Sequence, residues 1–314
     1  MSNQKVNHQL KARVYRSTGS WYIIKNAAGA FLQARFKGKF KIDAAIKSSN
    51  PIAVGDWVIY EELPDEEGIV TITDIEKRNN YIVRVSPQNR HHKHIISANL
   101  DAAIVIATID SPKTSMGFVD RFLITAAAYH IPAILIINKI DLLKDKHQHT
   151  LATWIKTYTD AGYPVIPMHV EDAEKIKELN ALLANKTTLF SGHSGVGKST
   201  LINKILPNIQ QRTKIVSDWS GKGQHTTTFA ELFDLPMGGQ IIDTPGVKEF
   251  GLIAIEKNEL GHYYPEIKQY MSACKFNNCI HINEPQCAVK NAVQEGRINV
   301  DRYKSYLQIL QTLD

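Results

Sequence analysis

Residues 192–199 read Gly-His-Ser-Gly-Val-Gly-Lys-Ser and satisfy the phosphate-binding pattern G-x-x-x-x-G-K-[ST] in full. The segment follows an apolar run at 187–191 and opens a stretch with helical spacing at 200–206, which is the context that the pattern requires. Glycines let consecutive backbone N–H groups converge on phosphate oxygens, and the start of a helix adds positive potential. We predict that Lys198 contacts the β- and γ-phosphates of a nucleotide and that Ser199 ligates Mg²⁺. The residues expected to line this site are Ser191, Gly192, His193, Ser194, Gly195, Val196, Gly197, Lys198, Ser199 and Thr200.

A second motif, N-K-x-D, ends the apolar run at 133–138 and consists of Asn138, Lys139, Ile140 and Asp141. A carboxylate at Asp141 can accept two hydrogen bonds from the N1–H and the N2 amino group of guanine. Adenine has neither donor, so a buried acceptor would stay unpaired. Alone, the four-letter pattern is typical of polar turns, but beside a phosphate loop it predicts binding of GTP and GDP.

Residues 243–246, Asp-Thr-Pro-Gly, follow another apolar run and complete a nucleotide site. Asp243 fits a carboxylate that supports Mg²⁺, and the Gly246 N–H fits a γ-phosphate contact that opens on hydrolysis. The polar segment 217–228 fits a switch loop, in which either Thr226 or Thr227 completes the Mg²⁺ coordination. The same segment also reads as a disordered polar loop, and a switch needs low local stability.

The order of these motifs is unusual, because N-K-x-D precedes the phosphate loop, whereas Ras-like GTPases place it last. Every motif still follows an apolar strand, at the edge where an open α/β sheet binds ligands. If the termini of a Ras-like GTPase were joined and the chain were cut before the strand that begins at Ala102, the motifs would keep their places at that edge. The motif order therefore predicts a circularly permuted GTPase.

Val247 stands where Ras-like enzymes have a water-orienting Gln. His225 is our candidate catalytic residue, since imidazole can orient or deprotonate water. The alternative is that His225 is a surface histidine in a flexible loop without a catalytic role.

All three cysteines of the chain lie close together with one histidine, as Cys274, Cys279, His281 and Cys287. Three thiolates and an imidazole make a closed tetrahedral Zn²⁺ shell with no position for water, so we predict one structural zinc ion. Three reduced cysteines in a small core are the alternative. The adjacent histidines of 91–94 suit a basic surface better than a second metal site. A C-terminal docking face is predicted from the helical spacing of Tyr303, Leu307, Leu310 and Leu313.

The elements that carry these residues lie in regions with different hydrophobic patterns. Short strands at 21–24, 56–60 and 69–75, separated by turns, predict a small all-β barrel of the oligonucleotide-binding (OB) kind. Residues 29–41 alternate with period two, which places Arg35, Lys37, Lys39 and Lys41 on one strand face as RNA-binding candidates or as a solvated basic face. From Ala102, apolar runs alternate with helix-length stretches at 119–129 and 150–161, which predicts a parallel sheet covered on both faces.

We therefore expect an α/β protein with three domains: an OB-fold RNA-binding barrel at 1–76, a circularly permuted P-loop GTPase domain at 77–254, and a zinc-binding domain with a C-terminal helix at 255–314.

A chain of 314 residues with 43% hydrophobic and 22% charged residues is ordinary for a globular protein, and its net charge of +6 permits a polyanionic partner. The first ten residues lack the apolar core of a signal peptide, and no apolar run is long enough to span a membrane. Three cysteines cannot form a disulfide framework, so we expect a cytoplasmic protein without a membrane partner.

Over nearly its whole length the sequence resembles one family, the RsgA (YjeQ) ribosome small subunit-dependent GTPases. The matching segments are 54–56, 98–101, 120–123, 138–141, 192–199, 223–228, 243–246 and 274–290. One departure is Met168-His169-Val170, where the family usually has a Ser-Ala pair near the guanine. The resemblance implies a cytoplasmic GTPase that binds the 30S subunit and its 16S rRNA late in maturation and hydrolyses GTP to GDP and phosphate with stimulation by the subunit. It also implies that His225 is the catalytic residue, and we expect a monomer.

Two other classes of function fit parts of the sequence. A nucleotide-gated rRNA-binding module with little turnover is compatible with Val247. A general P-loop phosphotransferase is compatible with the phosphate loop, but Asn138–Asp141 argues against it.

Overall fold

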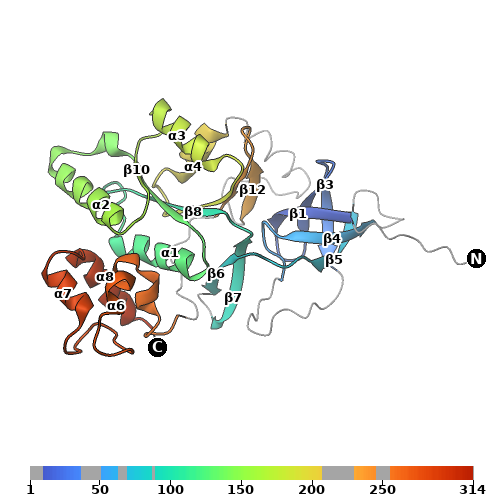
Figure 1. Ribbon diagram of the computed structural model, residues 1–314. Helices are drawn as coiled ribbons and strands as arrows, with labels where there is room; N and C mark the ends of the chain where they lie inside the picture. Colours follow the sequence, from blue (N-terminus) through green and yellow to red (C-terminus); the bar gives the residue numbers. More distant parts are fainter. Residues whose placement is uncertain are drawn as a thin grey trace, which may run out of the picture. The chain divides into compact units, whose positions relative to one another are not determined.

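The computed structural model describes residues 10–36, 51–62, 69–86, 89–206, 230–244 and 255–313. The chain forms two compact units (Figure 1). The first comprises Met1–Leu100, Asn185–Leu189 and Asn208–Pro245, and the second comprises Asp101–Ala184, Phe190–Pro207 and Gly246–Asp314. Each unit thus combines segments that are far apart in the sequence, and the boundaries of the three expected domains stay a prediction. Among the described helices, none has the length and apolar character needed to cross a membrane.

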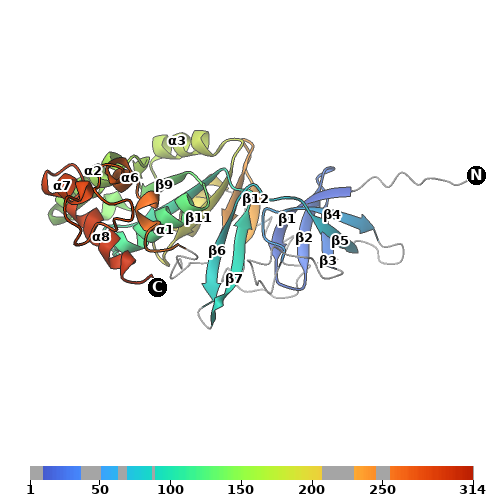
Figure 2. The ribbon, with the colours of Figure 1, turned by 60° about the horizontal axis from the view of Figure 1, so that its bottom comes forward.

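In the described part of the first unit, five strands close into a barrel, drawn in blue in Figures 1 and 2. They are β1 (Leu10–Ser17), β2 (Tyr22–Asn26), β3 (Phe31–Phe36), β4 (Trp57–Glu62) and β5 (Ile69–Ile75). Strand β3 pairs in parallel with β5, while the pairs β1–β2, β2–β3, β4–β5 and β1–β4 are antiparallel. Alternate residues such as Ala12, Val14 and Ile72 fill the interior. This confirms the predicted OB-like barrel.

The described residues of the same unit form two further antiparallel pairs. Strands β6 (Tyr81–Ser86) and β7 (Asn89–Ala98) form one, and β12 (Glu231–Asp234) and β13 (Gln240–Asp243) form the other. Strand β12 also pairs with β1, at Arg16 opposite Glu231. The β12–β13 pairing differs from the parallel arrangement expected throughout the sheet, because a short turn at 235–239 returns the chain directly.

The second unit contains the parallel strands β8 (Ala102–Ala107), β9 (Ala133–Ile137) and β10 (Val165–Pro167), with β9 between the other two. Strand β8 is buried along its whole length, as expected for a strand covered on both faces. The helices are α1 (Met116–Ala128), α2 (Gln148–Asp160), α3 (Ala173–Leu183) and α4 (Lys198–Ile205). Helix α1 begins before its predicted start because the Ser115 side chain accepts the Phe118 N–H as an N-cap. Strand β11 (Thr187–Gly192) passes from the first unit into the second.

The C-terminal part of the second unit consists of the 3₁₀ helix η3 (Leu260–Tyr263) and helices α6 (Pro265–Met271), α7 (Ala288–Gln294) and α8 (Val300–Leu310). These elements, red and orange in Figure 2, lie beside α1 and share an apolar core with Ile124 of that helix. The predicted docking face is partly right, since Leu310 and Leu313 are buried in this core. Tyr303 and Leu307 are only partly buried, and Tyr306 and Ile309 fill more of the contact.

Candidate nucleotide site and metal centre

The phosphate loop follows the buried strand β11 and leads into α4, as its sequence pattern predicts. Gly195 and Gly197 have φ values of 85° and 93°, in the left-handed region that favours glycine. A Cβ atom at Gly197 would lie 2.4 Å from Asn138 Nδ2, and one at Gly192 would lie 2.8 Å from the Ile106 carbonyl oxygen. Glycine is therefore needed at these positions for close contact between segments.

The N-K-x-D motif contacts the phosphate loop directly. Asn138 is buried, and its Nδ2 atom donates to the Val196 carbonyl oxygen at 2.8 Å. Its Oδ1 atom is also buried and has no hydrogen-bond partner among the described residues. Such an acceptor normally receives a hydrogen bond from a ligand or from water. The structure thus brings together two motifs that the sequence separates.

Asp141 lies in the 3₁₀ helix η1 (Ile140–Leu142), where its side chain is exposed and accessible to a ligand. Lys139 precedes it with a φ of 61°, and its Nζ atom donates to the Ser111 carbonyl oxygen at 2.9 Å. The Ile140 N–H donates to the Met168 carbonyl oxygen at 3.4 Å. Met168-His169-Val170, where the sequence departs from the family that it resembles, therefore begins beside the turn that carries Asp141.

The other predicted nucleotide ligands are only partly described. Ser199 and Thr200 are exposed in the first turn of α4, while Lys198 is mostly buried. Asp243 ends β13 in the first unit and is 8% exposed. The predicted switch and catalytic residues His225, Thr226, Thr227 and Gly246 lie outside the described residues.

The predicted RNA-binding strip is described at one position. Arg35 is exposed on β3, and its guanidinium lies 4.1 Å from the ring centroid of Trp21, in a cation–π contact. The strip continues into Lys37, Lys39 and Lys41, which lie outside the described residues. Its role stays a prediction.

One segment beside the nucleotide site carries no sequence motif and was missed by sequence reasoning. Residues 108–115 follow β8 at the ligand-binding edge of the sheet, where the Thr108 N–H donates to Thr114 Oγ1 at 3.0 Å. A Cβ atom at Gly195 would lie 3.4 Å from Pro112 Cδ, so this segment packs against the phosphate loop. The only sequence signal was the position of a polar turn directly after a buried strand.

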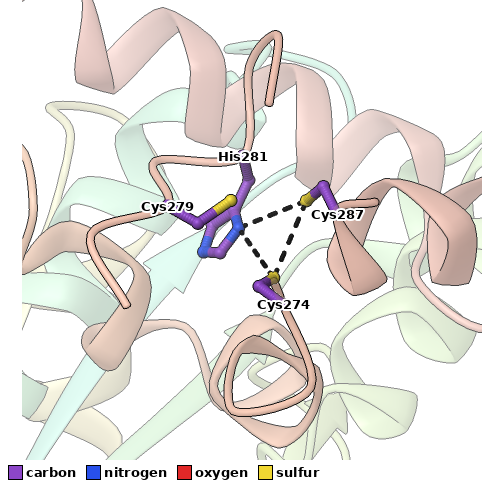
Figure 3. Close-up of side chains that lie close together, drawn as sticks. All are labelled: Cys274, Cys279, His281 and Cys287. Atoms are coloured by element: carbon purple, nitrogen blue, oxygen red, sulfur yellow. Dashed lines mark hydrogen bonds between the residues drawn. The ribbon is translucent and has the colours of Figure 1, made fainter. Parts of the chain in front are cut away.

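The predicted metal ligands converge on one point (Figure 3). Their donor atoms in Cys274, Cys279, His281 and Cys287 all lie within 4.8 Å of one another. The Sγ atoms of Cys274 and Cys287 are 3.8 Å apart, and His281 Nδ1 lies 3.6 Å and 3.4 Å from them. Ligands placed tetrahedrally around Zn²⁺ would be about 3.8 Å apart for two sulfurs and about 3.6 Å apart for sulfur and nitrogen. The observed donor set fits a structural zinc ion.

Burial also shapes the protonation of these ligands. It raises the pKa of the Cys279 thiol to about 12 and raises the pKa of Cys287, so without a cation these thiols are protonated at neutral pH. Burial lowers the pKa of His281, which favours the neutral imidazole that metals bind. The carboxylate of Glu284 accepts the N–H groups of Ile280 and Ile282, both at 2.8 Å, and so orients the ligand loop.

Comparisons with known proteins agree with this architecture. A model of the RsgA GTPase matches residues 75–253, and a model of the RsgA N-terminal domain matches residues 11–70. A relative from Flavobacterium psychrophilum named small ribosomal subunit biogenesis GTPase RsgA is 48% identical over 300 residues, covering 95% of this chain and 91% of the relative. A protein of the same name from Bacteroides fragilis is 43% identical over 302 residues, with 96% of each chain covered.

Two solved structures are similar in fold. YjeQ from Thermotoga maritima is 30% identical, with a TM-score of 0.75 and coverage of 97% of this chain and 98% of the other. YloQ, described as a circularly permuted GTPase, is 28% identical, with a TM-score of 0.72 and coverage of 99% and 97%. The fold and the motif order thus define a circularly permuted P-loop GTPase, an enzyme that hydrolyses GTP. The chain belongs to the RsgA GTPase family.

Proposed function

We propose that this GTPase acts in the late maturation of the 30S ribosomal subunit, and that the subunit stimulates its hydrolysis of GTP to GDP and phosphate. The observation that carries the proposal is the direct contact between Asn138 and the phosphate loop, in a chain 48% identical to a protein named as a small ribosomal subunit biogenesis GTPase. A chain that carries both a nucleotide site and a basic strip has what a factor needs to bind rRNA in one nucleotide state and release it in the other.

In this proposal, Asp141 selects guanine and the phosphate loop with Lys198 binds the phosphates. The residues that would hold Mg²⁺ are Ser199, Asp243 and one of Thr226 and Thr227. Their hydroxyl and carboxylate oxygens are the ligands that Mg²⁺ prefers, and the bound ion neutralises charge on the phosphates. The exposed position of Ser199 in the first turn of α4 supports this assignment.

His225 would orient or deprotonate the attacking water. The support comes from the sequence: Val247 follows Gly246 at the place where a Ras-like enzyme has its water-orienting Gln. Free protein would then position the water poorly, and a bound subunit would place His225 beside the water. The Gly246 N–H would contact the γ-phosphate and lose that contact on hydrolysis.

The surfaces that bind 16S rRNA would be the strip Arg35, Lys37, Lys39 and Lys41 on the barrel and the zinc-binding C-terminal domain. The net charge of +6 and the exposure of Arg35 support the first of these surfaces. The fit of the Cys₃His cluster to tetrahedral geometry supports a zinc ion that stabilises the second. We further propose that the protein is monomeric and works in the cytoplasm.

Co-sedimentation with purified 30S subunits tests this function, with 50S subunits as the control particle. We expect binding to 30S that is tighter with a non-hydrolysable GTP analogue than with GDP. Equal binding in both nucleotide states would contradict the switch, and equal binding to both subunits would contradict the specific role in 30S maturation.

A nucleotide-gated rRNA-binding module with little turnover is the second candidate, favoured by Val247. It predicts the same nucleotide-dependent binding but no increase in GTP hydrolysis when subunits are added, so turnover separates the two.

A further inference from the structure

Arg302 on α8 is a large side chain that is almost completely buried, with 1% of its surface exposed. Its Nη1 atom donates to Asp120 on α1, and its Nε atom donates to Glu266 on α6 at 2.6 Å. The guanidinium also lies over the aromatic rings of Tyr158, Tyr163 and Tyr264. A buried charge held in this way resists displacement, because breaking one pair would leave uncompensated charge in the interior.

Helix α8 is also attached to the metal centre. The Tyr303 hydroxyl donates to the His281 carbonyl oxygen at 2.5 Å, and the Tyr306 hydroxyl donates to the Ile280 carbonyl oxygen at 2.9 Å. One helix therefore contacts the metal-ligand loop through two tyrosines and contacts α1 through Arg302.

The other side of α1 touches the nucleotide site. The ring of Phe118 lies 3.6 Å from the ring of His193 in the phosphate loop, centroid to centroid, and Phe118 is 7% exposed. Residues two apart on a helix point about 200° away from each other. Asp120 and Phe118 therefore hold Arg302 and His193 on nearly opposite sides of the same helix.

We propose that Arg302 is a positioning residue for the phosphate loop, acting through Asp120 and α1, so that nucleotide binding and the order of the C-terminal domain are energetically coupled. The metal-ligand loop, α8, α1 and His193 form a chain of direct contacts within one compact unit. Coupling of this kind is reciprocal: a nucleotide that fixes His193 also fixes Phe118 and α1, and thereby stabilises α8. This inference goes beyond the proposed role in subunit maturation and does not require the ribosome.

Hydrogen–deuterium exchange of the full-length protein tests the coupling, with and without saturating GDP. We expect GDP to slow amide exchange in α8 by about five-fold or more. His193→Ala removes the ring that Phe118 contacts and should abolish this effect at a GDP concentration that fluorescence titration shows to saturate the variant, while exchange of α8 without nucleotide stays as in the parent. His193→Phe keeps a ring at the same place and should restore the effect.

Two further variants and a binding control complete the test. Phe118→Leu keeps an apolar side chain without the ring and should also uncouple α8 from GDP. Arg302→Lys keeps the charge but not the forked donors, and should weaken GDP binding about five-fold. Unchanged exchange of α8 in the parent, with GDP binding shown by fluorescence titration, would overturn the coupling and leave the nucleotide site standing. If GDP still protects α8 fully in His193→Ala, the coupling does not run through the contact between His193 and Phe118. Failure of the parent to bind GDP would overturn the nucleotide site itself.

Discussion

Asp141 is the side chain on which base selectivity is predicted to depend, and it is exposed in a turn fixed by Asn138 and Lys139. Asp141→Asn removes two charge-assisted hydrogen bonds to guanine, which together are worth about 3 kcal/mol or more. We expect GTP binding to weaken about 100-fold, and binding of xanthosine triphosphate to improve because its C2 oxygen accepts from the new amide. Fluorescence titration of both nucleotides measures the change. Asp145→Asn alters an exposed carboxylate nearby and serves as the control; unchanged GTP affinity in Asp141→Asn would contradict the base-reading role.

The Cys₃His cluster predicts one zinc ion per chain that survives dialysis. Cys279→Ser or His281→Ala should lose the ion together with the folded state of residues 257–314, because metal binding and folding are coupled in such sites. His262→Ala changes an exposed histidine outside the cluster and should keep the zinc. Elemental analysis of freshly purified protein measures the zinc content, and the absence of zinc from the parent would show that the cluster is a set of reduced thiols.

Partly buried polar contacts attach the barrel to the strand pair β12–β13 within the first unit. Asp234 on β12 accepts from the Tyr15 hydroxyl at 2.5 Å, from Lys25 Nζ at 2.6 Å and from Gln240 Nε2 at 3.0 Å. Burial by itself would raise the pKa of Asp234, but the hydrogen bonds from Lys25, Tyr15 and Gln240 lower it below its ordinary value. The barrel is therefore held to β12 by this carboxylate as well as by the β1–β12 pairing.

This cluster predicts a specific loss of stability in acid. Because the pKa of Asp234 is lower in the folded state, its stabilising contribution is present above the ordinary value of 3.8 and is lost as the pH falls through the folded-state value. Asp234→Asn should reduce the free energy of unfolding by about 1–3 kcal/mol at pH 7 and flatten its decline between about pH 5 and pH 3. Urea unfolding at several pH values measures both effects, with the exposed Asp74→Asn as the control. Parallel pH profiles for Asp234→Asn and the parent would refute the assignment.

Some elements could be read from the sequence and others could not, for physical reasons. Strand β5 was predicted with its observed bounds, because its sequence is rich in β-branched residues and is bounded by turn-forming residues. Strand β1 was missed because Lys11, Arg13 and Arg16 alternate with its buried residues and hide its apolar face. Strand β12 was missed because Glu231 and Asp234 flank only two apolar residues, which is too short a pattern to indicate a strand.

For the whole molecule, local motifs were predictable and long-range packing was not. The phosphate loop, N-K-x-D and the Cys₃His cluster each consist of close neighbours in the chain whose chemistry limits their spacing. Arg302 gave no signal, since arginine is normally exposed and its partners Asp120 and Glu266 lie 182 and 36 positions away. The contact of Phe118 with the phosphate loop likewise depends on packing that no motif encodes.

If the protein binds rRNA as proposed, its affinity should fall steeply as the salt concentration rises. Each basic side chain that neutralises a phosphate adds about one to the slope of log affinity against log salt concentration. Replacing Lys37, Lys39 and Lys41 by alanine should weaken 30S binding at low salt and reduce this slope by about three if all three contact phosphates. Filter binding between 50 and 200 mM salt, concentrations at which such slopes are usually resolved, measures it. A slope equal to that of the parent would show that the strip is only a solvated face.

Stimulation of GTP hydrolysis by the small ribosomal subunit distinguishes the proposed maturation factor from a GTPase that acts independently of the ribosome. The most direct measurement is the rate of phosphate release from GTP with purified 30S subunits, with 50S subunits and with the protein alone. We predict slow release from the protein alone, a large increase with 30S, no increase with 50S, and loss of the 30S effect in His225→Ala with GTP binding retained. The same rate with and without 30S would contradict stimulation by the subunit.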